Sequence, residues 1–182
     1  MVYPQDARDN EFVRRTLEGD TAAFGELVEA YQTPVFRVAS RIVGDKDEAA
    51  DVTQSTFLKA FEQLRRFNPR YRFFTWLYTI AVRTAINAAR KRSGEAIRPE
   101  GFDVAAPDED HAERNDERRF VRRAIGELPP DLRAPLVLFH YDDCSYSEIA
   151  ELVGTTETRV RSRIFEARKR LRLLLQRNGY AT

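Results

Sequence analysis

Arginines and aromatic residues alternate in one short stretch of the chain. Residues 70–78 read Arg-Tyr-Arg-Phe-Phe-Thr-Trp-Leu-Tyr and follow directly on Asn68 and Pro69. Guanidinium groups neutralise phosphates, and aromatic rings stack on bases that have left a duplex. The stretch therefore favours binding to unpaired nucleic acid. An alternative is that Phe73, Phe74 and Trp76 simply belong to a hydrophobic core.

A polar, basic face continues downstream of this stretch. It carries Arg83, Asn87, Arg90, Lys91 and Arg92. Such a face could lie against DNA, although basic helix ends are common and the pattern alone does not identify a contact. A helix from about residue 74 to residue 92 must position these groups, because apolar positions recur in it every three or four residues.

The most specific motif lies between residues 145 and 171. Ser147 is expected to cap a short helix, and Gly154 stands where a turn needs a positive φ angle. A second helix follows, with Val160, Ile164 and Ala167 on its buried side. This pattern predicts a helix-turn-helix whose second helix enters a major groove. The alternative is an amphipathic hairpin with a solvated basic face.

The remaining elements are also expected to be helical, so the sequence predicts an all-α fold. An apolar stripe from Phe24 to Val43 predicts one helix, which Pro34 should kink or interrupt and Gly44 should end. Asp47 opens a second helix that reaches about residue 64. Two further helices are expected near residues 120–128 and 132–139.

Charge divides the chain into three blocks. Residues 93–117 carry nine acidic and two basic side chains, whereas the flanking blocks, residues 1–92 and 118–182, are both net basic. Acidic, proline-containing segments disfavour a packed core. The sequence therefore predicts two small helical domains joined by an acidic flexible linker, with the helix-turn-helix in the second domain.

Composition excludes several classes of protein. No apolar run approaches the ~20 residues that span a bilayer, and the N-terminal residues lack the basic and apolar segments of a secretion signal. Cys144 is the single cysteine, so no intramolecular disulfide can form. These features predict a cytoplasmic protein without membrane insertion.

Nothing in the sequence predicts an enzyme or a cofactor. No phosphate-binding glycine loop, nucleophile elbow or catalytic acid pair is present. His140 and Cys144 lie four residues apart, but a structural zinc site needs four ligands and the other histidine, His111, lies in the linker. We therefore expect no metal site, and packing accounts better for Cys144.

Both basic blocks together resemble a bacterial extracytoplasmic-function (ECF) sigma factor of the sigma-70 family. The resemblance rests on residues 47–61, on residues 74–81 with 85–87 and 90–92, and on Leu128-Pro-Pro, residues 147–150 and residues 160–171. Their order and spacing are more specific than any one piece. The resemblance implies a protein that binds core RNA polymerase and directs promoter-specific initiation by recognising −35 and −10 elements and opening the −10 DNA.

The resemblance also implies a role for each block. Residues 1–92 would be sigma region 2 and residues 118–182 sigma region 4, and an anti-sigma factor would be a further partner. The implied polymerase contacts are Asp51, Gln54, Ser55 and Leu58. The implied −10 contacts are Asn68, Arg70, Tyr71, Arg72, Phe73, Arg83, Asn87, Arg90 and Lys91. The implied −35 contacts are Arg159, Arg161, Ser162, Phe165, Arg168 and Lys169.

Two other classes of protein remain open from the sequence. One is a two-domain helix-turn-helix regulator that binds a duplex operator without polymerase, and the other is an all-helical adaptor that binds only protein. The aromatic residues at 71–78 favour a sigma factor, because a reader of duplex DNA has no use for a base-stacking surface.

Overall fold

The computed structural model describes residues 4–94 and 120–177, and every regular element in these two ranges is helical. Nearly all of the acidic block predicted as a linker lies outside the described residues. None of the helices in the described ranges is both long enough and apolar enough to cross a bilayer. The elements are α1 (Pro4–Leu17), α2 (Thr21–Val43), α3 (Lys46–Glu62), the 3-10 helix η1 (Leu64–Arg66), α4 (Phe73–Gly94), helical residues 120–126, α6 (Pro130–Tyr141), α7 (Tyr146–Val153) and α8 (Glu157–Arg177).

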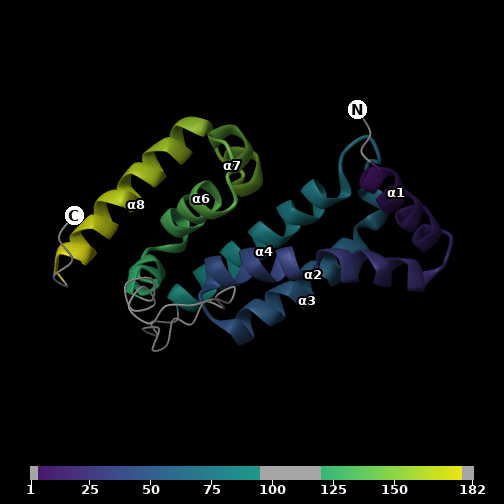
Figure 1. The fold of residues 1–182 in the computed structure, drawn as a ribbon, viewed down its shortest axis with the longest axis horizontal. Coiled ribbons are helices and arrows are strands. Elements are labelled where there is room, and N and C mark those ends of the chain that lie inside the picture. Colours follow the sequence, from purple (N-terminus) through teal and green to yellow (C-terminus); the bar gives the residue numbers. More distant parts are fainter. Residues whose placement is uncertain (1–3, 95–119, 178–182) are drawn as a thin grey trace.

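The first group of helices comprises α1 to α4. Helices α2, α3 and α4 all pack against one another, and α1 packs at one end of α2 (Figure 1). As the sequence predicted, Gly44 ends α2 in the left-handed conformation with a φ of 80°, and its N–H bonds the carbonyl of Ser40. Asp45 then caps α3 by accepting a hydrogen bond from the Glu48 N–H at 2.9 Å.

The sequence predicted that Pro34 would kink or interrupt this helix, and the interruption does not occur, because α2 continues through Pro34. A proline inside a helix removes one backbone hydrogen bond and crowds the preceding turn. In α2 the residues around it, Tyr31, Val35 and Val38, are all buried in the core. Most helical stability in proteins comes from such packing, which here outweighs the local cost.

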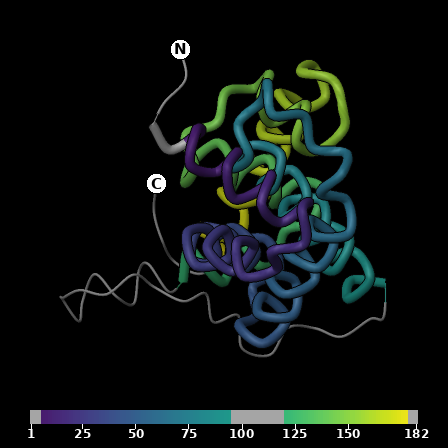
Figure 2. The backbone as a smooth tube through the Cα atoms, turned by 90° about the vertical axis from the view of Figure 1, so that its right-hand side faces the viewer, coloured from purple at the N-terminus to yellow at the C-terminus, as the bar shows by residue number. Residues whose placement is uncertain are grey.

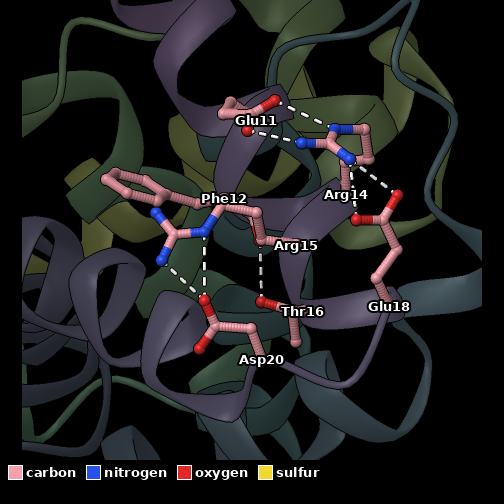
Figure 3. Close-up of polar contacts among 7 residues, drawn as sticks. All are labelled: Glu11, Phe12, Arg14, Arg15, Thr16, Glu18 and Asp20. Carbon is pink, nitrogen blue, oxygen red and sulfur yellow. Dashed lines mark hydrogen bonds and ion pairs between the residues drawn. The ribbon is translucent and has the colours of Figure 1, made fainter.

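Paired charges fix the turn between α1 and α2 (Figure 3). Arg14 forms ion pairs with Glu11 and Glu18 on either side of it. Arg15 Nη2 lies 2.6 Å from a carboxylate oxygen of Asp20, and the other oxygen of Asp20, the N-cap of α2, accepts the Ala23 N–H. The pairs are exposed and individually weak, and among them the Arg15–Asp20 pair links α1 to the start of α2.

The second group comprises α6, α7 and α8. Ser145 caps α7, because its hydroxyl accepts the Glu148 N–H while the Glu148 carboxylate accepts the Ser145 N–H at 2.8 Å. The prediction that Ser147 is the cap was therefore wrong, and Ser147 lies inside α7. Gly154 has a φ of 69°, as the turn of the predicted helix-turn-helix requires.

The two groups pack against each other. Helix α6 contacts α2 and α4, and α7 contacts α4, whereas α8 lies on the outer side of the second group (Figures 1 and 2). Arg133 of α6 is only 6% exposed. Its Nη1 donates to the carbonyls of Ile42 at 2.9 Å and Val43 at 3.2 Å, at the end of α2. No sequence pattern predicted this contact.

Candidate nucleic-acid and polymerase interface

Helix α8 presents one polar, basic face to solvent. Val160, Ile164 and Ala167 are buried against α6 and α7, which fixes the opposite side of the helix as the free one. Phe165 on that side is 72% exposed. A large apolar side chain so exposed indicates a contact surface, and an aromatic ring can pack on a thymine methyl group. The six predicted −35 residues are all exposed: Arg159, Arg161, Ser162, Phe165, Arg168 and Lys169.

Three arginines of α8 already have partners within the protein. Arg161 Nη2 lies 2.6 Å from Glu157 Oε1, one helical turn earlier. Arg170 Nε lies 2.8 Å from Glu166 Oε1 with the same spacing. Arg168 Nη2 lies 3.2 Å from the Nε2 atom of His140, a residue of α6. The exposed basic face of α8 therefore also contacts α6.

The loop before α4 forms a compact exposed turn. Asn68 Oδ1 accepts the Arg70 N–H at 3.0 Å, and the Asn68 carbonyl accepts the Tyr71 N–H at 3.0 Å. Tyr71 is left 70% exposed. Arg72 Nε donates to Asp6 of α1 at 3.1 Å, so α1 helps to position this loop. Four of the predicted −10 residues, Asn68, Arg70, Tyr71 and Arg72, thus lie together at the surface.

Phe73 does not belong to this exposed group. Its side chain is 1% exposed, and its ring packs at 5.5 Å from Phe67 and 5.6 Å from Trp76 between centroids. A base cannot stack on a ring whose faces are already covered by core side chains. For Phe73 the alternative reading as a core residue is the correct one, and the predicted −10 contact through its ring is not available in this structure.

The basic face of α4 turns toward the second group of helices. Arg83 donates from Nε to the Leu152 carbonyl and from Nη2 to the Glu151 carbonyl, both at 3.1 Å. Arg90 Nη2 lies 2.6 Å from Asp131 Oδ1. Asn87 lines the small cavity of about 170 Å³ between these contacts, and Lys91 is exposed. The structure thus places two of the predicted −10 arginines in contacts between the groups.

An apolar groove of about 640 Å³ opens between α2 and α3. Leu58 at its edge is 58% exposed, and the neighbouring Phe61 is also exposed. Of the predicted polymerase contacts, Gln54 and Leu58 line the groove, whereas Asp51 and Ser55 do not. Phe61 also lines the groove and was not predicted from the sequence, although the spacing of Leu58 and Phe61 by three residues places them on one side of α3.

The sequence predicts that His140 and Cys144 do not form a metal site. Within residues 4–94 and 120–177, no three side chains of the types that bind metals cluster together. His111 lies outside the described residues. Cys144 is half-buried, and its burial raises the pKa of the thiol to about 11. A thiol with so high a pKa is a poor nucleophile.

Comparisons with known proteins agree with this geometry. A model of sigma-70 region 2 matches residues 27–95, and a model of sigma-70 region 4 matches residues 119–171. The RNA polymerase sigma-H factor of Pseudomonas aeruginosa is 38% identical over 187 residues, which cover 93% of this chain and 94% of the relative. The chain belongs to the ECF sigma factors of the sigma-70 family.

Two further relatives resemble this sigma factor over most of its length. The ECF RNA polymerase sigma-E factor of Escherichia coli K12 is 38% identical over 177 residues, covering 88% of this chain and 91% of its own. The solved structure of CnrH, in complex with the cytosolic domain of CnrY, matches with a TM-score of 0.65 and 25% identity, covering 94% of this chain and 99% of that one. In this sigma factor, the match to region 2 covers most of α2 together with α3 and α4, and the match to region 4 extends into α8.

Proposed function

We propose that this sigma factor binds core RNA polymerase and directs promoter-specific initiation. One observation carries the proposal: a single chain presents both a helix-turn-helix with an exposed basic face and a separate loop of exposed aromatic and basic groups. The first suits duplex DNA and the second suits unpaired bases. The relatives are named as sigma factors of RNA polymerase, which supports the same conclusion.

The two helical groups would have different binding roles. Residues 1–92 bind polymerase through the α2–α3 groove and recognise and melt the −10 element through the loop before α4. Residues 118–182 recognise the −35 element through α8, and residues 93–117 link the two. Joining two individually modest DNA readers raises the effective concentration of each. The chain performs no chemistry of its own and acts in the cytoplasm, where polymerase and promoter DNA meet.

A partner that blocks the polymerase surface is part of the proposal. The CnrH match comes from a complex with the cytosolic domain of CnrY. An anti-sigma factor bound in the groove at Leu58 and Phe61 would compete directly with polymerase. An amphipathic segment suits this groove, because apolar side chains line most of it.

Initiation requires the two helical groups to separate. Arg83 and Arg90 bond α7 and Asp131 in the structure, so these side chains are directed at the second group of helices, and a DNA strand would have to enter between the two groups to reach them. The contacts are hydrogen bonds and an exposed ion pair, which are individually modest. Binding to polymerase and promoter can therefore replace them.

We expect the purified chain to initiate transcription only together with core polymerase. A promoter selected from random sequence by the reconstituted holoenzyme provides the template, and run-off transcription measures the result. Core polymerase alone and the chain alone are the controls. Tight binding of a duplex operator by the chain without polymerase, and no promoter-specific transcript with it, would establish the regulator instead.

Two arginines of α8 separate base reading from phosphate attraction. Arg161 and Arg170 are both exposed, and each pairs with a glutamate one turn earlier. Replacement by alanine therefore removes one ion pair within α8 in each case. We expect Arg161→Ala to reduce the preference for the cognate −35 element over a scrambled one by about ten-fold, the effect of losing a base-reading arginine. Arg170→Ala should weaken binding to both DNAs alike and reduce the salt slope by about one.

Binding of each variant to both DNAs across a salt series decides between these outcomes. Equal losses of affinity for the two DNAs in Arg161→Ala would mean that this side chain contacts only the phosphate backbone of DNA. The assignment of the Arg161 side of α8 to the major groove would then be wrong.

A further inference from the structure

Two aromatic rings from different helices stack beside α8. Phe139 near the end of α6 and Tyr146 at the start of α7 have ring centroids 5.0 Å apart and planes inclined by 15°. Both side chains are half-buried and pack on the hydrophobic core. Tyr146 follows directly on the Ser145 cap, which fixes the start of α7. The rings thus form a stacked pair packed on the core, which no sequence pattern predicted.

Each ring carries an arginine of α8. The guanidinium carbon of Arg161 lies over the Tyr146 ring, 4.7 Å from its centroid, and that of Arg168 lies over the Phe139 ring at 5.4 Å. Residues seven apart lie on the same side of a helix, about 10 Å apart along its axis. The four side chains therefore form one array across three helices, in the order Arg161, Tyr146, Phe139, Arg168.

Further contacts restrain both ends of the array. Glu157 holds Arg161 through the 2.6 Å ion pair. His140 holds Arg168, and because arginine only donates, the imidazole Nε2 must accept. Burial and the nearby Arg168 charge lower the pKa of His140, which favours the neutral ring that can accept this bond.

The geometry suits a reader of base edges. A ring attracts a cation through its face, so an arginine stacked on it keeps N–H donors at its edge for a planar partner. Free arginine side chains lose considerable rotamer entropy when they bind. An arginine already held in place loses less, so contacts with bases gain in affinity and in specificity.

We infer that Tyr146 and Phe139 are positioning residues that set Arg161 and Arg168 for reading the −35 element. The inference rests on the proposed function, in which α8 reads that element. Arg170 serves as a contrast within the same helix, because its ion-pair partner, Glu166, belongs to α8 itself. Sequence preference at −35 therefore depends on rings from α6 and α7 that need not touch DNA.

The test compares leucine with phenylalanine at position 146. We expect Tyr146→Leu to reduce the preference of the holoenzyme for the cognate over the scrambled −35 element by about three- to five-fold, as the loss of one cation–π contact would. Tyr146→Phe keeps the ring and should keep the preference. The salt slope should not change in either variant, because no charge is removed. Phe139→Leu should behave like Tyr146→Leu.

Tyr141→Leu provides a matched control. Tyr141 lies at the end of α6, and the arginine over its ring, at 5.0 Å, is Arg41 of α2 rather than a residue of α8. The same chemical change there removes a similar contact and should leave the −35 preference as it is. An equal loss in Tyr141→Leu would show that the effect is general destabilisation and would overturn the inference.

A double-mutant cycle separates positioning from structure. In the Arg161→Ala background, Tyr146→Leu should cause no further loss of preference, whereas a purely structural role for the ring would add its own loss. Thermal unfolding of every variant is followed in parallel. If Arg161→Ala lowers the −35 preference but Tyr146→Leu and Phe139→Leu do not, the positioning role is wrong while the proposed function stands. If the wild-type holoenzyme shows no −35 preference, the proposed function itself fails.

Discussion

Leu58→Asp should reduce polymerase-dependent transcription by about 30- to 100-fold, the loss expected for a hot-spot residue of a protein interface. Leu58 lies at the edge of the groove between α2 and α3 and is 58% exposed, so the isolated chain tolerates a charge there. A partner that covers the groove would instead bury an unpaired carboxylate. Transcription from a selected promoter, and the affinity for core polymerase measured by fluorescence anisotropy, report the effect.

Leu173→Asp is the matched control for this prediction. Leu173 is a leucine of similar exposure, 53%, on α8, and it belongs to neither proposed binding surface. The same change there should alter polymerase affinity by less than about two-fold, as surface substitutions usually do. If Leu58→Asp binds polymerase normally while its far-UV circular dichroism is intact, the groove is not the polymerase surface.

Arg133→Met should lower the free energy of unfolding by about 3 kcal/mol, because it leaves several buried carbonyls without their donor. Arg133 donates to Ile42 and Val43 at the end of α2 and, from Nε and Nη2, to Leu128. Burial, together with repulsion from Arg92, lowers its pKa to about 10, so the side chain is still a cation at neutral pH. One side chain thus joins α6 to the first group of helices.

Urea unfolding measures this change with two probes. Trp76, the single tryptophan, reports on the first group, and far-UV circular dichroism reports on all helices. Arg123→Met is the control, because Arg123 is exposed and its loss should change stability by less than about 0.5 kcal/mol. An unchanged midpoint for Arg133→Met by both probes would contradict the prediction. Small-angle scattering would show whether the two groups also move apart.

Local pattern was sufficient for most of the helices, although not for α1, and for the exposed face of α8. The spacing of Val160, Ile164 and Ala167 fixes which side of α8 is buried, so its exposed side could be predicted without any knowledge of the tertiary structure. The glycines at positions 44 and 154 have the positive φ angles expected of helix ends. The true N-cap of α7, Ser145, could also have been predicted from the sequence, because Ser145 and Glu148 have the spacing of a capping box.

Tertiary packing decided what local pattern left open. Phe73 and Tyr71 are both aromatic and two residues apart, yet the first is buried and the second is exposed, because only Phe73 meets the rings of Phe67 and Trp76. The uninterrupted course of α2 through Pro34 has the same cause. In both cases the deciding contacts come from residues elsewhere in the fold.

The sequence by itself determined an all-helical protein of this family, the positions of its main helix ends and the exposed face of α8. These features depend on residues within one or two helical turns, and such neighbours are fixed by the backbone period. The groove at Leu58, the buried Arg133, the partners of Arg83 and Arg90 and the array at Tyr146 were decided only by the tertiary structure. Each joins residues on different helices, whose relative placement depends on the packing of the whole core rather than on local spacing.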